Sequence, residues 1–295
     1  MGTRAEGDHA PLRSTLAQVA AREPWLAVHA EVPAGEPGWC CAADLIDQPG
    51  ALDQLVASAA DQLAVDHPGA TVQVRRAVAA ALLLADWSWA LGVLGAGSLA
   101  LTGRVPELLP SAVWLRWERG RVCGVTLTSR EFSCSSEDPD SGHGSASDVA
   151  DLEGALRAQL QQHLAQLHQR LRCGAAPLLR QGPRAMWGAA GDGLADVLRR
   201  QADGRPDAQA IRSIATRVLS GAPTCWGRSN FIDVVDDAGR DQVTRRRTSC
   251  CLYYRLPETP PCSSCPRLGA EVASLAAPLA ARQSGDDGIA AAGKG

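Results

Sequence analysis

The sequence predicts an α+β fold that is mainly helical, with a small antiparallel β-sheet and a cysteine-rich segment near the C-terminus. Three observations lead to this class. Leucines repeat at helical spacing between 149 and 171, a long apolar run covers 77–103, and two short apolar stretches flank an Arg-Gly-Arg turn at 119–121. Apolar residues at steps of three and four are typical of a helix with one buried face, whereas short stretches around a turn are typical of a β-hairpin.

The composition is that of an ordinary soluble protein, with 45% hydrophobic and 21% charged residues in 295. This length allows one large domain or two lobes. The formal net charge is −3, so no excess of positive charge points to a nucleic-acid partner. The first 14 residues carry charges without an apolar core, and no signal peptide is expected.

Shifts in composition divide the chain into five segments. We expect a flexible N-terminal segment that passes into a short helix, a helical lobe with the hairpin, a second helical lobe, the cysteine-rich segment, and a disordered tail rich in Ala, Gly and Ser. Their boundaries are 1–22, 23–147, 148–244, 245–268 and 269–295.

The apolar run between Arg76 and Arg104 contains a single charged residue, Asp86. It is long enough for a membrane span, but an aspartate at its centre would be costly in lipid. We therefore expect a buried helical pair, broken near 92–97 by three glycines, and no integral membrane span. Those glycines do not predict a nucleotide-binding loop, because no clear strand precedes them and no acidic residue follows at the required distance.

The leucine repeat predicts a helix over 148–172 with Asp148 as its N-cap. His163 and His168 flank its buried stripe on different faces and are not expected to share a ligand. The stretch 112–128 predicts the hairpin, and 231–235 predicts a further strand of the sheet. The acidic stretch 131–147 is expected to be an exposed, flexible loop.

Further helices are expected over 51–64, 194–201 and 208–219 from their apolar periodicity. A proline break is expected at Pro183.

Four of the ten cysteines lie within sixteen residues, with the spacing C-C-x10-C-x2-C. They are Cys250, Cys251, Cys262 and Cys265. The last two can hold one metal atom from a tight turn, whereas adjacent side chains such as those of Cys250 and Cys251 point to opposite faces of an extended chain. A tetrahedral zinc site gains little from such a pair. A cluster with two iron atoms and four thiolate ligands accepts it more easily.

Two alternatives stay open for these residues. One is a structural zinc site on the same four cysteines, and the other is a thiol–disulfide pair of Cys262 and Cys265. Redox CxxC motifs occur in a βαβ frame, whereas Pro266 follows this one directly. The other six cysteines are scattered and are expected to be small buried side chains. They are Cys40, Cys41, Cys123, Cys134, Cys173 and Cys225.

The run from Arg247 through Cys250-Cys251-Leu252-Tyr253-Tyr254-Arg255, followed by Cys262-x2-Cys265-Pro266, resembles the FhuF-type ferric-siderophore reductases. In that family a C-C-x10-C-x2-C run holds a [2Fe-2S] cluster. The clear resemblance covers about residues 247–266, and only weak similarity is visible at 186–188 and 101–106.

The resemblance implies that Cys250, Cys251, Cys262 and Cys265 bind a [2Fe-2S] cluster. It also implies a cytoplasmic oxidoreductase that reduces Fe(III) in a ferric siderophore by one-electron, outer-sphere transfer and so releases Fe(II). The partners would be the ferric siderophore and an unidentified cytoplasmic electron donor, and no catalytic residue is implied beyond the ligands. The alternatives are an iron–sulfur electron-transfer or sensing protein and an interaction module held together by zinc.

Positive charge near such a cluster has a physical role, because reduction makes the cluster more negative. One charge at about 8 Å and an effective dielectric near 20 contributes roughly 2 kcal/mol, or about 90 mV for one electron. The arginines that could act in this way are Arg245, Arg246, Arg247, Arg255 and Arg267. Arg247 and Arg255, with Tyr253 and Tyr254, are the candidates for a surface beside the cluster.

Overall fold

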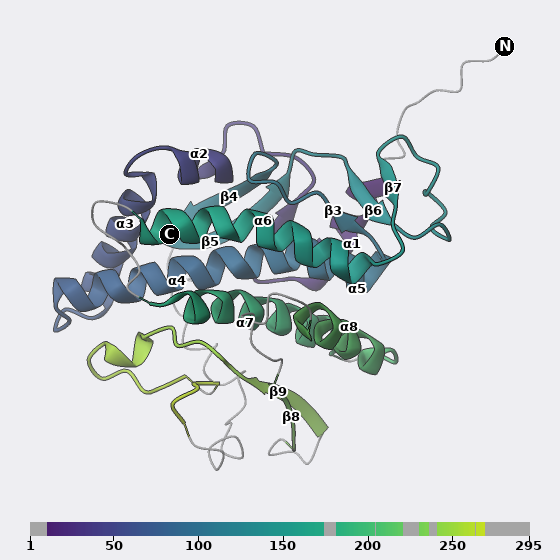
Figure 1. Cartoon of the computed structure of the whole chain (residues 1–295). Helices are drawn as coiled ribbons and strands as arrows, with labels where there is room; N and C mark the ends of the chain where they lie inside the picture. Colours follow the sequence, from purple (N-terminus) through teal and green to yellow (C-terminus); the bar gives the residue numbers. More distant parts are fainter. Residues whose placement is uncertain are drawn as a thin grey trace, which may run out of the picture.

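The computed structural model describes residues 11–173, 181–203, 205–220, 230–235, 241–262 and 264–268. Long helices pack with a small sheet, and a C-terminal ribbon and loop lie beyond α7 and α8 (Figure 1). The predicted α+β class is confirmed. The helices are α1 (Pro11–Arg22), α2 (Ala42–Asp47), α3 (Ala51–Asp66), α4 (Val72–Gly92), α5 (Ser98–Thr102), α6 (Leu152–Arg172), α7 (Pro183–Ala202) and α8 (Ala208–Ser220).

The strands form three separate sheets in the order β1-β5-β4-β2, β3-β6-β7 and β8-β9. Their bounds are β1 (Ala27–His29), β2 (Trp39–Cys41), β3 (Val105–Pro106), β4 (Val113–Glu118), β5 (Arg121–Leu127), β6 (Phe132–Cys134), β7 (Ala146–Asp148), β8 (Asn230–Val235) and β9 (Asp241–Arg246).

The hairpin predicted over 112–128 is confirmed as β4 and β5, which pair antiparallel. Two details of the predicted sheet are wrong. The sheet is mixed, because β1 pairs with β5 in parallel. The strand predicted over 231–235 joins β9 in a two-stranded ribbon of its own instead of extending the hairpin sheet.

The apolar run forms one long helix where we expected a broken pair. α4 continues through a π-helical turn, Val93–Gly97, into α5, and the backbone at Gly92 and Gly97 stays right-handed helical. The glycines serve close packing: a Cβ on Gly95 would lie 2.5 Å from the Leu156 side chain. In the described part of the chain this is the one helix long and apolar enough to cross a membrane, and 78% of its apolar window is buried. Such burial is consistent with the core helix of a soluble protein.

The predicted helix over 148–172 begins later than expected. Asp148 ends β7, and the N-cap is Asp151, whose carboxylate accepts a hydrogen bond from the Gly154 N–H at 2.8 Å. The leucine stripe is buried as predicted. Both histidines are also buried: His163 bonds Trp87, and His168 packs edge-on against Trp187.

The acidic stretch 131–147 is more ordered than predicted. β6 and β7 occupy its two ends and pair with each other. Between them, Asp138 and Asp140 bind the buried Arg104 guanidinium at 2.8 and 2.7 Å. The pairing with Arg104, 34 residues away from Asp138, ties this stretch to the body of the protein.

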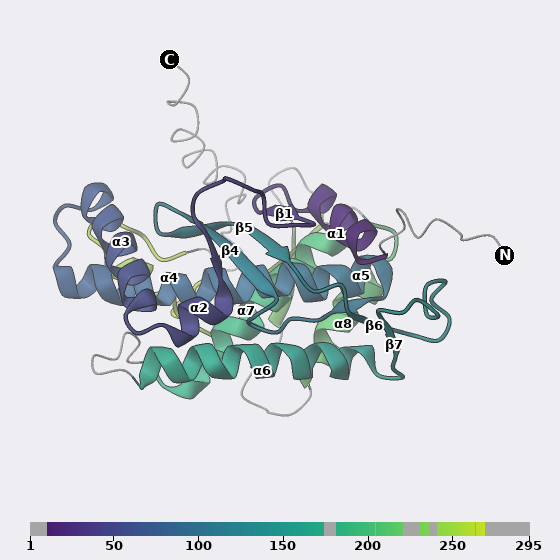
Figure 2. The same ribbon diagram turned by 90° about the horizontal axis from the view of Figure 1, so that it is seen from above.

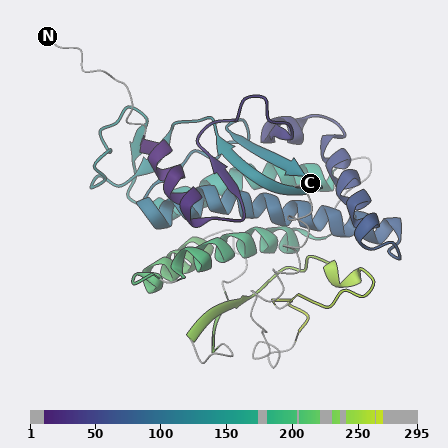
Figure 3. The same cartoon turned by 180° about the vertical axis from the view of Figure 1, so that it is seen from behind.

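Helix α7 carries the C-terminal segment. Pro183 occupies the first turn of this helix instead of breaking one, as suits a residue without an N–H to donate. One side of α7 packs against α4, and β9 and the following loop lie on its other side (Figures 1 and 3). Seen from above, α6 covers a different face of α4 and the sheet (Figure 2). The cysteine-rich segment therefore rests on the helical body, as predicted.

The division into five segments stays a prediction. Residues 11–22 form α1, and Leu12, Leu16 and Val19 of this helix are buried in the core. The stretches 1–10 and 269–295 lie outside the described residues.

Candidate metal centre

The cysteine-rich segment folds back on itself after β9. A 3-10 turn, Tyr253–Arg255, follows Cys250 and Cys251 and is entered through Leu252 in a left-handed conformation (φ 61°). The chain then returns, so that the Arg247 N–H donates to the Ser264 carbonyl at 3.0 Å. This bond brings the Cys262–Cys265 turn beside the start of the segment, and the turn itself is closed by the Cys265 N–H and the Cys262 carbonyl at 2.9 Å.

Asp192 of α7 holds the start of the segment. Its carboxylate accepts backbone N–H bonds from Thr248 at 2.8 Å and Ser249 at 2.9 Å. It also accepts hydrogen bonds from the Thr248 and Ser249 hydroxyls. Its oxygens lie 3.3 Å from the Arg245 guanidinium and 3.5 Å from that of Arg247. A buried carboxylate that binds backbone donors and two guanidiniums fixes the chain immediately before Cys250.

The four thiols lie in one neighbourhood. The Cys251 and Cys262 side chains share a hydrogen bond, and Cys265 acts electrostatically on Cys250 and Cys262. Cys265 is buried and the other three are half-buried. The folded segment thus brings together the two ends of the C-C-x10-C-x2-C run.

Electrostatics favour a thiolate at this place. The hydrogen bond from Cys262, the Arg247 charge and backbone hydrogen bonds together lower the pKa of Cys251 to about 5, against the effect of burial. The pKa of Cys262 is raised, because it supplies the proton for that bond. The Arg247 side chain, only 16% exposed, remains charged because Asp192 and the two thiols outweigh its burial and raise its pKa.

The donor set consists of sulfur atoms and has the chemistry that an iron–sulfur cluster needs. No group of three or more His, Cys, Asp or Glu side chains within the described ranges is arranged to hold one metal ion. The thiols interact across the folded segment: Cys251 with Cys262, Cys265 with both Cys250 and Cys262, and Cys250 with its neighbour Cys251. A [2Fe-2S] cluster takes four thiolates, so these four side chains fit it in number and kind.

The other arginines and the tyrosines predicted to lie beside the cluster contact other groups or are exposed. Arg245 binds Asp192 and Asp196, Arg246 donates to the Leu268 carbonyl at 2.6 Å, and Arg255 is exposed. The Tyr253 hydroxyl lies 3.5 Å from His67 Nε2, and the Arg267 guanidinium stacks 4.6 Å from the centre of the Tyr254 ring. Both tyrosines are half-buried. Arg247 is thus the candidate arginine for which an interaction with the thiols is seen.

No interaction with the four thiols is seen for the other five described cysteines. Cys41 and Cys134 are buried as expected and Cys40 and Cys123 are half-buried, whereas the expected burial is wrong for Cys173, which is exposed. Burial raises the pKa of Cys40, Cys123 and Cys134, as expected for small apolar side chains. Cys225 lies outside the described residues.

Sequence reasoning missed Asp192. It lies 56 residues before Thr248 in a helix with no visible metal motif. The available signal was an acidic residue among small apolar residues (Gly188-Ala189-Ala190-Gly191-Asp192-Gly193), which places a charge on a face that must pack closely.

Comparison with known proteins agrees with this centre. Residues 247–267 match the family model described as the FhuF 2Fe-2S C-terminal domain. The comparison with curated proteins gave no match. The C-terminal segment is therefore an iron–sulfur domain of the FhuF type, and its cofactor is a [2Fe-2S] cluster. This match covers a small part of the chain.

Proposed function

We propose that this protein is a cytoplasmic ferric-siderophore reductase. Cys250, Cys251, Cys262 and Cys265 hold the [2Fe-2S] cluster, and the partners are a ferric siderophore and a cytoplasmic one-electron donor. The observation that carries the proposal is the match of residues 247–267 to the FhuF domain, at the place where the fold gathers four thiols. When bound, the cluster supplies one-electron transfer to Fe(III), and siderophores hold the resulting Fe(II) far more weakly.

The chain's own residues contribute position and charge. Asp192 holds Thr248 and Ser249, which fixes the segment before the first ligand. Arg247 places a positive charge beside the thiols. Cys250, Cys251 and Cys262 are only half-buried, so a bulky chelate can approach without covalent contact.

Two other functions share the same geometry. Zinc on these cysteines would give a structural or interaction module, and the cluster without a siderophore partner would serve electron transfer or iron sensing. Metal analysis separates the first: the proposal expects iron and labile sulfide with a visible absorbance that dithionite bleaches, whereas a zinc module is colourless.

The second is separated by a reoxidation experiment. Protein reduced with dithionite, freed of reductant and mixed with a ferric siderophore should recover its visible absorbance and yield Fe(II) that a ferrous chelator traps. Reduced, cluster-loaded protein that stays reduced with every ferric chelate tested would reject the reductase function and leave the electron-transfer or sensing role.

A further inference from the structure

The backbone after Cys251 directs two consecutive N–H groups at the thiols. The Leu252 N–H donates to the Cys250 sulfur at 3.4 Å, and the Tyr253 N–H donates to the Cys251 sulfur. Each bond acts to lower the pKa of the thiol that accepts it. Two adjacent cysteines, whose side chains diverge in an extended chain, are thus each met by a donor from the turn that follows them.

Leu252 makes this arrangement possible through its backbone conformation. It is left-handed, with φ 61° and ψ 3°, and the right-handed 3-10 turn Tyr253–Arg255 follows it directly. A left-handed residue next to a right-handed one turns successive N–H groups toward the same side, which forms a concave anion site called a nest. Nests of this kind occur at phosphate sites and at iron–sulfur sites. Here the N–H groups of the nest meet thiol sulfurs.

Packing holds Leu252 in a conformation that leucine rarely adopts. A left-handed residue with a side chain is disfavoured, because its Cβ crowds the following carbonyl oxygen. The Leu252 and Tyr253 side chains are half-buried against the hydrophobic core, and the Tyr253 ring meets the His67 ring edge-on at 5.9 Å. The Arg255 N–H closes the turn on the Leu252 carbonyl at 2.9 Å. The side chains thus fix the turn while its N–H groups serve the sulfurs.

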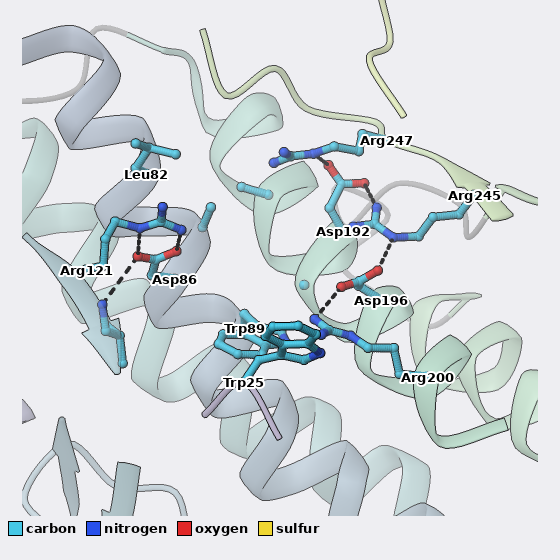
Figure 4. A pocket seen from close by; sticks show the side chains of 14 residues that line it. Trp25, Leu82, Asp86, Trp89, Arg121, Asp192, Asp196, Arg200, Arg245 and Arg247 are labelled. Carbon is cyan, nitrogen blue, oxygen red and sulfur yellow. Dashed lines mark hydrogen bonds and ion pairs between the residues drawn. The ribbon is translucent and has the colours of Figure 1, made fainter. Parts of the chain in front are cut away.

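The positive side chains nearest to the segment are shared with carboxylates. Arg245 and Arg247 line a cavity of about 530 Å³ between α4, α7 and the start of β5, and both point at aspartates of α7 (Figure 4). Arg247 lies 3.5 Å from Asp192, and Arg245 lies 3.3 Å from Asp192 and 3.4 Å from Asp196. These carboxylates offset the guanidinium charges but not the dipoles of the backbone N–H groups. The two donors of the nest therefore remain as a source of positive potential at the thiols.

We propose that the nest formed by the Leu252 and Tyr253 N–H groups raises the reduction potential of the cluster, and that Leu252 is its positioning residue. A hydrogen bond to a sulfur ligand stabilises the reduced cluster more than the oxidised one, because reduction adds negative charge. The inference rests on the proposed function only in the assignment of the four cysteines as ligands. It requires no property of the siderophore.

Two substitutions at position 252 separate the backbone from the side chain. Leu252→Gly removes the side chain but adopts the left-handed conformation easily, whereas Leu252→Val keeps an apolar side chain that disfavours this conformation. The measurement is a redox titration of the cluster-loaded protein, followed by its visible absorbance. At a fixed applied potential, Leu252→Val should lower the ratio of reduced to oxidised cluster about fivefold, a shift of about −40 mV. Leu252→Gly should stay within about twofold of the natural protein.

A role of Leu252 in packing alone predicts the reverse order, because glycine loses more contacts than valine. Equal shifts in the two variants, or a larger shift in Leu252→Gly, would overturn Leu252 as the positioning residue.

A backbone ester removes the N–H donor itself and keeps every side chain, so it decides the question even if Leu252→Val binds no cluster. An ester in place of the Tyr253 amide should lower the ratio of reduced to oxidised cluster about fivefold. The matched control is an ester at Leu256, whose N–H donates to the Tyr253 carbonyl at 3.0 Å instead of to a sulfur. This control should leave the ratio unchanged.

Each outcome of the ester experiment supports or overturns the nest. Equal potentials of the two ester proteins, or equal loss of the cluster from both, would overturn it. Loss of the cluster from the Tyr253 ester alone would support it, because the donor would then be needed to hold the cluster. If the potential shifts as expected but no ferric chelate is reduced, the nest stands and the reductase function fails. If ferric siderophore is reduced but the potential is the same in both esters, the reductase function stands and the nest fails.

Discussion

Asp192 on α7 accepts two hydrogen bonds from Ser249, the residue immediately before Cys250: one from its backbone N–H at 2.9 Å and one from its hydroxyl at 2.6 Å. Both residues are buried. The contact joins the helical body to the cysteine-rich segment, so the positions of the proposed ligands depend on a residue that is not one of them.

Replacing Asp192 should therefore loosen the metal centre. Asp192→Asn removes the negative charge and places an amide NH₂ group among several N–H donors. The free energy that holds the segment on α7 should fall by about 3 kcal/mol. We expect less iron and sulfide per chain after purification and faster loss of the visible absorbance on warming. Asp203→Asn, at the exposed C-cap of the same helix, is the control. Full and equally durable cluster content in both variants would contradict the anchoring role.

The ligand assignment is tested by serine substitutions. Cys262→Ser should lower the iron content by more than half, because it replaces a proposed thiolate ligand and removes the hydrogen-bond partner of Cys251. Cys173→Ser changes an exposed cysteine outside the centre and should leave iron, sulfide and the visible spectrum unchanged. An unaltered spectrum in Cys262→Ser, or equal loss in both variants, would reject Cys262 as a ligand.

The turn between β4 and β5 depends on a glycine whose replacement should lower stability. Gly120 has a φ of 75°, and a Cβ there would lie 2.4 Å from the Ala59 backbone of α3. Gly103 has a similar φ of 69°, but a Cβ there would have no neighbour within 4 Å. A substitution at Gly103 therefore measures the cost of the backbone conformation alone. Gly103→Ala should cost about 1 kcal/mol in free energy of unfolding, and Gly120→Ala should cost about 3 kcal/mol or more. Urea unfolding measures both, and equal costs would show that α3 yields to the methyl group.

Local patterns predicted the elements whose cause is local. The leucine repeat identified α6, the apolar stretches around Arg119-Gly120 identified β4 and β5, and the cysteine spacing identified the metal-binding segment. Each of these depends on residues close together in the sequence.

Features that depend on distant partners were missed or misjudged. The glycines of the apolar run looked like a break, but Gly95 admits Leu156 from another helix. Asp148 and Asp151 are both good caps, and the pairing of β6 with β7 takes Asp148 into a strand. The contact between Asp192 and Ser249 and the cavity beside it depend on how α4, α7 and the C-terminal segment pack, which the local sequence does not encode.

Two buried histidines should make stability depend on pH. The pKa of His163 and of His168 is lowered to about 4, mainly by burial. His163 Nε2 accepts from Trp87 Nε1 at 3.0 Å and Nδ1 donates to the Leu108 carbonyl at 2.7 Å, which fixes the neutral ring. The unfolded chain binds a proton near pH 6.5 and the folded chain only near pH 4, so stability is complete above pH 6.5 and falls between these values.

From pH 7 to pH 5 the loss should be on the order of 2 kcal/mol per histidine. His163→Gln keeps an amide donor and acceptor but cannot titrate there, so its free energy of unfolding should fall less over this interval. His143→Gln, at an exposed histidine, is the control. Urea unfolding at several pH values measures the slopes, and identical slopes for the two variants would show that His163 is not the cause.

The last prediction concerns the charge beside the thiols. The hydrogen bond from Cys262 lowers the pKa of Cys251 most, and the Arg247 charge lowers it too. The Arg247 charge also acts to lower the pKa of Cys262 and of Cys250. The same field stabilises the more negative, reduced cluster, so Arg247→Gln should lower the reduction potential. One charge at about 8 Å is worth up to about 90 mV, and the opposite charge of Asp192 reduces this to tens of mV.

Arg255→Gln is the matched control, because Arg255 is close in sequence to the cysteines but exposed, where water screens its charge. A redox titration of the visible absorbance should show a clear negative shift for Arg247→Gln and a smaller one for Arg255→Gln. Cluster content is checked in both, since Arg247 also contacts Asp192 at 3.5 Å. An unchanged reduction potential in a fully loaded Arg247→Gln protein would mean that Asp192 neutralises the charge of Arg247, so that this charge does not affect the potential of the cluster.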